Sequence, residues 1–288
     1  MSNVTALSHD EPREQSYPVL RDRTRLGVLL PLCVFVALAI MCIVVAAFTS
    51  AQRANEVAIE RDKKLFTKTI ANRGAWSLRK LKSIIDSDAP AEANVPVDLD
   101  QVLQRVGSGL KTLIDHDFVL VTDASGHLVH SFIKRDSIGP DWLPAAFPEL
   151  APALAYLHGE NRAAPNNLVW LTEPKQSANG SYAAEAAFLQ MLMGRTAIIA
   201  GIVTGTGDAK TGGGKAPIVL TLQFIDDALL SDVGARLQLA NLRKIGEEPI
   251  PAGDHVFSFH DQHSQAVMRF VWTPERPEIG RASCRERV

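Results

Sequence analysis

The chain has 288 residues, 46% of them hydrophobic and 22% charged, which is the composition of a folded globular protein rather than of a disordered one. Its formal net charge of −2 lacks the basic excess that nucleic-acid binding requires, so we expect no nucleic-acid partner. Cysteine occurs at Cys33, Cys42 and Cys284, so residues 50–277 can hold neither a disulfide framework nor a thiolate zinc site.

An uncharged apolar run stands near the amino terminus, over residues 26–48. As a helix, its 23 residues span about 35 Å, enough to cross the hydrocarbon core of a bilayer. We predict a transmembrane helix over residues 26–49, with the lipid bilayer as a partner. A cleaved signal peptide is the alternative, with Thr49, Ser50 and Ala51 as the cleavage site, but its apolar core is normally shorter than this run.

Basic residues predict the orientation of this helix. Arg21, Arg23 and Arg25 precede it and only Arg53 is as close on the other side, although basic residues at 61, 63 and 64 narrow the contrast. Basic residues mark the cytoplasmic side of a membrane helix. We expect residues 1–25 to be a cytoplasmic tail of a bacterial inner-membrane protein, and the chain beyond the helix to lie in the periplasm.

Two helices are predicted next. Residues 50–85 indicate a long stalk helix, with Phe66, Ile70, Leu78, Leu81 and Ile85 recurring near helical spacing. Residues 87–96 contain two prolines and end it. A second helix begins after Asp98, which is expected to cap it together with Gln101. Its apolar stripe is Leu99, Val102, Leu103, Val106, Leu110, Leu113 and Ile114.

The rest of the chain predicts strands with helical interruptions. Two β-rich runs flank Asp123–Gly126 and indicate a hairpin. Prolines at 140, 144, 148 and 152 argue against a long helix between residues 139 and 159, and favour short helical turns beginning at Pro148 and Pro152. A helix over Asp227–Leu239 is expected, capped by Asp226. Further strands are predicted at Leu168–Leu171, Thr196–Thr204, Ile218–Ile225, His255–His260 and Ala266–Trp272.

The order of these elements predicts an α+β fold. Hairpin-like neighbours favour an antiparallel sheet backed by helices over a doubly wound parallel sheet.

The glycine-rich segment at residues 205–217 (GTGDAKTGGGKAP) superficially resembles a phosphate-binding loop. Its Lys215 is followed by Ala216 instead of serine or threonine, its glycine spacing differs, and a strand instead of a helix is predicted to follow. We interpret the segment as a flexible hairpin loop.

Two groups of residues invite a metal-site interpretation, because imidazole and carboxylate suit zinc or manganese. They are His255, His260 and His263 with Asp254 and Asp261, and His127 with His130. His255 and His260 are an odd number of positions apart in a predicted strand, so they point to opposite faces and cannot bind one ion. The same argument applies to His127 and His130, so we expect no metal site.

No motif predicts catalysis. The sequence lacks GxSxG and HExxH, and residues 50–277 contain no cysteine nucleophile, so no catalytic residue is assigned. A triad of scattered serine, histidine and aspartate residues stays open. Trp76, Trp170 and Trp272 could line a ligand pocket, although core packing is the commoner role of tryptophan. No cofactor is expected and no cofactor-binding residue is identified.

Three segments of the chain resemble the CHASE4 sensory domain, an extracytoplasmic module similar to the Cache and PAS-like sensors. They are Asp115–Phe132 (DHDFVLVTDASGHLVHSF), Leu220–Arg243 and Met268–Pro277, and the resemblance spans about residues 55–277. It implies that residues 50–277 form a Cache/PAS-like sensor domain. One departure follows Trp76, where Ser77 and Leu78 replace the acidic or Asn-Asp residues common in the family.

Proteins of this family carry the domain between two transmembrane helices, followed most often by GGDEF and EAL domains that make and degrade cyclic di-GMP. The resemblance implies a non-enzymatic input region of such a protein, with a small-molecule ligand of unknown identity. The apolar stripe of the stalk favours a homodimer. Two alternatives stay open: the input domain of a histidine kinase or chemoreceptor, and a membrane-anchored periplasmic enzyme.

The last residues differ in character from the rest. Residues 278–288 (EIGRASCRERV) contain three arginines and no apolar period, and look like the translation of a sequencing adapter joined to a gene fragment. We expect the natural sequence of this fragment to end at Pro277 and residues 278–288 to be a non-native tail.

Overall fold

The computed structural model describes residues 21–86, 98–113, 115–133, 141–160, 165–176, 183–204, 216–261 and 266–274. The chain divides into two compact units, Met1–Ala58 and Ile59–Val288. The predicted loop at residues 205–215, His263 and the tail at residues 278–288 lie outside the described residues.

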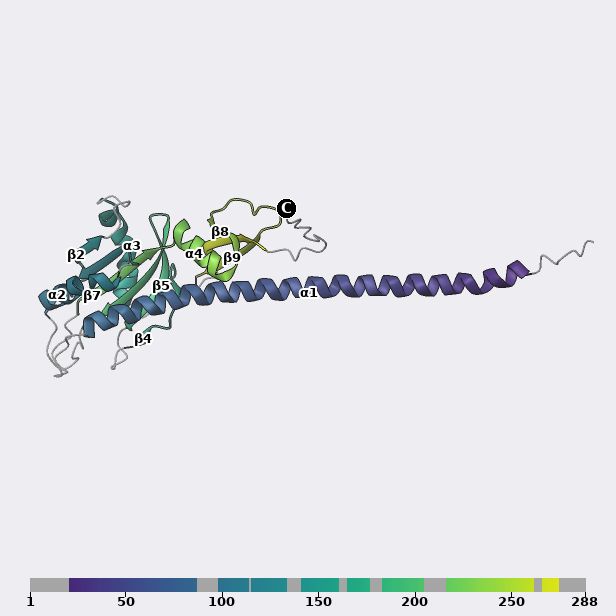
Figure 1. Ribbon diagram of the computed structural model, residues 1–288. Helices are drawn as coiled ribbons and strands as arrows, with labels where there is room; N and C mark the ends of the chain where they lie inside the picture. The colour runs from purple at the N-terminus through teal and green to yellow at the C-terminus, as the bar shows by residue number, and fades with distance from the viewer. Residues whose placement is uncertain are drawn as a thin grey trace, which may run out of the picture. The chain divides into compact units, whose positions relative to one another are not determined.

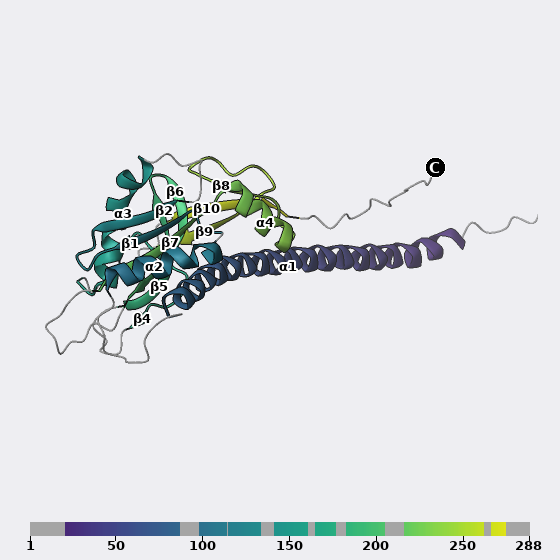
Figure 2. The ribbon, with the colours of Figure 1, turned by 60° about the vertical axis from the view of Figure 1, so that its left-hand side comes forward.

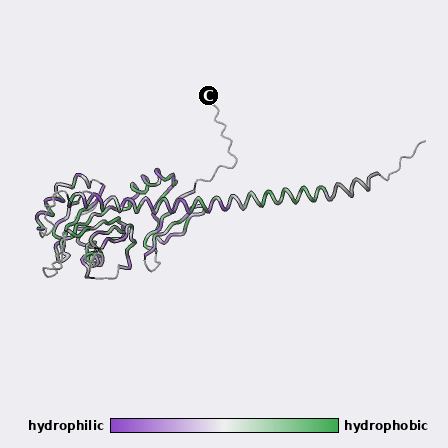
Figure 3. Tube along the Cα trace, turned by 90° about the horizontal axis from the view of Figure 1, so that it is seen from below, coloured by the Kyte–Doolittle hydropathy of each residue, from purple (hydrophilic) through white to green (hydrophobic). Residues whose placement is uncertain are grey.

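The long helix α1 (Arg21–Asp86) contains the predicted transmembrane segment and the predicted stalk (Figure 1). Within the described chain, one helical stretch, Pro31–Asp86, is long and apolar enough to cross a membrane, and its most apolar window has a mean hydropathy of 2.9 with none of it buried. The hydrophobic residues lie along the amino-terminal part of α1 (Figure 3). These properties are consistent with a single-pass membrane protein.

The second unit is built on a seven-stranded antiparallel sheet in the order β2-β1-β7-β6-β5-β3, with β4 paired to β5. Of the strands in this sheet, the ones that come first and last in the chain, β1 and β7, therefore lie side by side. The strands are β1 (Phe118–Thr122), β2 (Leu128–Ile133), β3 (Val169–Trp170), β4 (Lys175–Gln176), β5 (Ala183–Leu192), β6 (Arg195–Val203) and β7 (Ile218–Phe224). Together with the helices, this sheet confirms the predicted α+β fold.

Helices cover both faces of this sheet (Figure 2). One face packs against α3 (Trp142–Leu157), and the other packs against the carboxyl-terminal part of α1 and α2 (Leu99–Gly109), which continues into a 3-10 turn at Leu110–Leu113. The strands β1 and β7 are buried at every residue, which is the pattern expected when neither face meets water. Each fully buried leucine or isoleucine in these layers contributes about 1.5–3 kcal/mol of transfer free energy.

A smaller antiparallel sheet follows, in the order β8-β10-β9, with α4 (Asp227–Leu237) beside it. Its strands are β8 (Ala240–Ile245), β9 (His255–His260) and β10 (Ala266–Thr273). Phe66 and Ile70 of α1 are buried in the same apolar cluster as this sheet, and the Phe66 and Phe270 ring centroids are 4.9 Å apart. The helix α1 therefore contributes to the cores under both sheets.

The prediction for residues 139–159 is wrong, because α3 is one helix with Pro148 and Pro152 inside it. These prolines and Pro144 recur every fourth residue and are exposed, so the carbonyls that lose a partner face solvent. Each interior proline costs about 3 kcal/mol, and burial of the opposite apolar face offsets that cost. That face consists of Leu143, Ala146, Leu150, Ala153, Leu154 and Leu157.

The close approach of α3 to the sheet depends on a glycine. A methyl group built on Gly201 of β6 would stand 2.7 Å from Leu220 Cδ2 and 2.9 Å from Leu157 Cδ1. Both leucines are fully buried and have no room to withdraw. A larger residue at position 201 would therefore require the side chains of Leu220 and Leu157 to shift.

Most other predicted elements are confirmed within a few residues. The turn of the hairpin places Gly126 at φ 82, a backbone conformation that favours glycine. Asp226 caps α4 by accepting a hydrogen bond from the Leu229 N–H at 2.8 Å. Asp98 is the N-cap residue that precedes α2, but its side chain makes no capping hydrogen bond, contrary to prediction. The strands β4, β5 and β8 were not predicted.

Candidate functional site

A cavity of about 430 Å³ lies in the second unit, where α1, the segment before β1, the end of β7 and the start of α4 meet. Its volume lies in the range typical of small-molecule sites. Most of its lining residues are polar or charged, and the acidic ones are Asp115, Asp117, Asp226 and Asp232.

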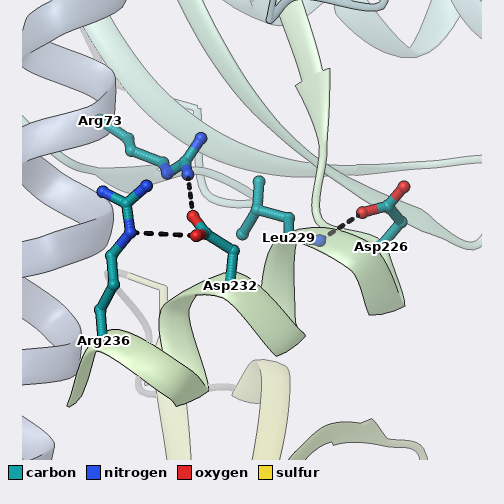
Figure 4. Close-up of polar contacts among 5 residues, drawn as sticks. All are labelled: Arg73, Asp226, Leu229, Asp232 and Arg236. Carbon is teal, nitrogen blue, oxygen red and sulfur yellow. Dashed lines mark hydrogen bonds and ion pairs between the residues drawn. The ribbon is translucent and has the colours of Figure 1, made fainter.

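The α4 wall of the cavity is held to α1 by one shared carboxylate (Figure 4). Asp232 of α4 accepts a hydrogen bond from Arg73 of α1 at 3.0 Å and another from Arg236, one helical turn further along α4, also at 3.0 Å. Arg73 is 25% exposed and Arg236 is 71% exposed, so the bridge between the two helices is the better protected pair. Asp226 stands at the start of the same helix.

The opposite wall is fixed by a buried carboxylate. Asp117 accepts a hydrogen bond from the Phe224 N–H at 2.7 Å, and its own N–H donates to the Leu222 carbonyl at 2.8 Å. Both bonds hold the segment before β1 to the end of β7. Gln223, between those two β7 residues, also lines the cavity and is 8% exposed.

A buried histidine connects this wall to α1. The His116 Nε2 is 2.9 Å from Ser77 Oγ, and the His116 ring stacks on Trp76 with ring planes 9° apart. The Lys80 ammonium lies 3.5 Å from the centre of the Trp76 ring on the same helix. His116 lines the cavity, whereas Trp76 packs against the His116 ring and does not line the cavity.

The lining offers charge and hydrogen bonds but few reactive groups. Four aspartates stand against two arginines, which gives a net charge of −2 when His116 is neutral. The described residues that line the cavity include no serine, threonine, cysteine or lysine, so a hydroxyl, thiol or amine nucleophile is missing from this set. The arrangement can hold a polar ligand.

The tryptophans considered from the sequence do not share a pocket. Trp170 packs on Tyr156 and Phe188 near the α3 face of the main sheet, and Trp272 is buried in the core of the smaller sheet. Trp76 alone is near the cavity, and it does not line it.

The residues considered for a metal site are used in other contacts. Asp254 accepts hydrogen bonds from Arg243 at 2.7 Å and from Thr273 at 2.8 Å, and these two bonds hold the pKa of its carboxyl below the usual range. His255 lies against the ring of Trp272. In the described parts of the chain, no three histidine, cysteine, aspartate or glutamate side chains are placed to hold a metal ion.

The other histidine pair belongs to the hairpin. His127 follows the turn, with its ring 3.5 Å from the Asp123 carboxylate, whereas His130 lies in β2 against Phe132. Desolvation tends to raise the pKa of Asp123, but hydrogen bonds from the N–H groups of His127 and Ser125 outweigh it and lower that pKa. The aspartate therefore stabilises the turn.

A second, smaller cleft of about 260 Å³ lies between α1 and the strand β5. Its carboxylate, Glu185, is already paired with Lys175 at 2.5 Å and with Lys82 of α1 at 3.5 Å. Burial tends to raise the pKa of Glu185, but the bond from Lys175 and the charges of both lysines lower it. Because its buried carboxylate is already paired with two lysines, this cleft is a weaker candidate than the first cavity.

Sequence reasoning identified few of the cavity residues. Asp226 was predicted as a helix cap, and the lining residues other than Arg73 fell in two segments of the family resemblance, Asp115–Phe132 and Leu220–Arg243, but no spacing linked these segments to each other or to Arg73. The cavity unites segments far apart in the chain, so no local pattern marks it.

No protein-family model and no curated protein matches this chain. Among solved structures, it is similar to the periplasmic domain of LuxQ from Vibrio cholerae. In one crystal structure, the TM-score is 0.37 and the identity 10%, covering 74% of this chain and 95% of that one. In another crystal structure of that domain, the TM-score is 0.36 and the identity 12%, and the match covers 74% of this chain and 97% of that one. Similarity at this level does not extend to ligands, so the function proposed below rests on the residues of this chain.

The geometry predicts unequal coupling within the arginine–aspartate cluster. Double-mutant cycles with alanine at Asp232 and at each arginine measure the coupling energy of each pair. We expect about 1 kcal/mol for Arg73–Asp232 and about 0.3 kcal/mol for Arg236–Asp232, because exposed ion pairs are screened by water. Urea unfolding of the full chain in detergent micelles measures both. Equal coupling energies would contradict the assignment of Arg73–Asp232 as the main bridge between α1 and α4.

Proposed function

We propose that the chain is the extracytoplasmic input region of a bacterial transmembrane signalling protein. Residues 1–25 are its cytoplasmic tail, residues 26–49 its membrane helix and residues 50–277 its periplasmic sensor domain. The observation that carries the proposal is the double role of α1. Its side chains from Leu32 to Phe48 are apolar and exposed, whereas Phe66, Ile70 and Leu81 are buried in the cores of the α+β unit.

The packing of α1 supports a mechanism of signal transfer. A ligand that favours one arrangement of the sheets and helices shifts a two-state equilibrium, and α1 shares its core with both sheets. A change in packing around Phe66 or Leu81 therefore alters the position of α1 within the domain. The size of the shift is limited by the difference in ligand affinity between the two states.

Cysteine labelling tests the proposed orientation. Ser125 is exposed in the turn of the hairpin, so in a variant without Cys33, Cys42 and Cys284 we expect Ser125→Cys to react with a membrane-impermeant maleimide in spheroplasts. Ser2→Cys, in the same background, should react only after lysis. Labelling of position 125 only after lysis would place the domain in the cytoplasm and refute the proposal.

The output of the intact protein is proposed to control cyclic di-GMP, on the CHASE4 resemblance alone. We expect the natural coding sequence after Pro277 to encode about 20 apolar residues, the length of a second membrane helix, and then a GGDEF or EAL domain. Sequencing the intact gene decides this. A kinase or chemoreceptor output would support the first alternative, and a stop codon without a second membrane helix would support an anchored periplasmic enzyme.

A homodimer formed through α1 is part of the same proposal. Val57 and Leu65 of α1 are apolar yet 70% and 37% exposed. In the background without native cysteines, we expect Val57→Cys to form disulfide-linked dimers under mild oxidation in membranes. Asn55→Cys, on the other side of α1, is the matched control and should crosslink much less. Equal crosslinking of the two variants, or none, would contradict a defined dimer interface.

A further inference from the structure

The cavity contains a buried amide that is available for a ligand. The Gln223 side chain is more than nine-tenths buried, lines the cavity, and makes no hydrogen bond to any described residue. Its amide group is open to the cavity, so a bound group can form hydrogen bonds with it. It offers one carbonyl oxygen as acceptor and one NH₂ group as donor.

Most charged residues of the lining already have a partner within the protein. Arg73 and Arg236 both donate to Asp232, so their positive charges are directed to one carboxylate. Asp117 and Asp226 each accept a backbone N–H bond at 2.7 and 2.8 Å. Counting its four aspartates as carboxylates against two arginines, the lining has a negative excess.

Asp115 is the carboxylate that remains available. It is exposed, lines the cavity, and has no ion pair or hydrogen bond to the described residues. A negative lining with one available carboxylate favours a cation over an anion. A metal ion is a poor fit, because the described residues offer no group of three ligands.

The remaining wall suits a short hydrocarbon chain. Phe224, Ala228 and Leu229 line the cavity beside the polar groups, and Phe224 and Leu229 are themselves buried. A volume of about 430 Å³ accommodates a small organic molecule rather than a bare ion.

We propose that this cavity binds a small organic ammonium compound, a primary amine or diamine. The Asp115 carboxylate and the Gln223 carbonyl oxygen accept hydrogen bonds from the ammonium group, and Phe224 and Leu229 contact its carbon chain. A charge-assisted bond to a carboxylate is about twice as strong as a neutral one, so Asp115 is the main anchor.

This site would connect ligand binding to α1. Arg73 of α1 lines the same cavity, and its bond to Asp232 of α4 closes one wall. A ligand inside the cavity contacts Leu229 of α4 beside the Arg73–Asp232 bridge, so it stabilises one arrangement of this wall. The inference names the ligand class of the proposed sensory role and rests on that role, but binding is measured without any signalling readout.

Titration calorimetry on the full chain in detergent micelles tests the proposal, with 1,4-diaminobutane and 1-aminobutane as probes. We expect saturable binding of one molecule per chain for at least one amine. Butanol and butyrate, of matched chain length, should not bind because they lack the positive charge. Absence of saturable binding by both amines, or equal binding of butanol, would overturn the proposal while leaving the result of the orientation experiment unaffected.

Variants then locate the site. Asp115→Asn removes the anchor at an exposed position, so folding should be retained, and we expect at least about tenfold weaker amine binding from the loss of one charge-assisted bond. Gln223→Leu should weaken binding as well, with folding checked by circular dichroism. Glu247→Gln makes the same carboxylate-to-amide change at an exposed residue away from the cavity and should bind like the parent chain. Unchanged affinity in Asp115→Asn would refute the assigned site.

Discussion

Burial of one face of α1 is the interaction on which the folded unit depends. From Phe66 to Ile85 this helix packs against the smaller sheet at one end and the main sheet at the other. Neither sheet can exclude water from that face without it, since an uncovered apolar face is unstable in water. The order of the chain reflects this, because the element that covers both sheets is synthesised before any strand.

The cavity follows from the same packing. Where α1 passes from one sheet to the other, α4 and the end of β7 do not fill the space with apolar side chains, and charged groups occupy it instead. The less exposed ionic groups at this junction are tolerated because they either pair, as Arg73 does with Asp232, or accept backbone N–H groups, as Asp117 and Asp226 do. The site is therefore a consequence of how two cores are joined.

Local signals made much of the fold predictable. The Asp123–Gly126 turn and the Asp226 cap depend on residues within a few positions of one another, and both were predicted correctly. The strand β5 was not, because its sequence AAEAAFLQML consists largely of residues that favour helices. Pairing with β6 from Glu185 to Leu192 overrides that preference. The cavity required tertiary contacts between Arg73 and residues beyond position 220, which no sequence spacing reveals.

The outward prolines of α3 have a consequence that reaches beyond the folded state. Each proline restricts φ in the denatured chain as well, so Pro144, Pro148 and Pro152 leave that segment fewer conformations to lose on folding. Where the native backbone accommodates the ring, a proline contributes about 0.4–1 kcal/mol in this way. The prolines that remove backbone hydrogen bonds from α3 thus also lower the conformational entropy of the unfolded chain, which favours folding.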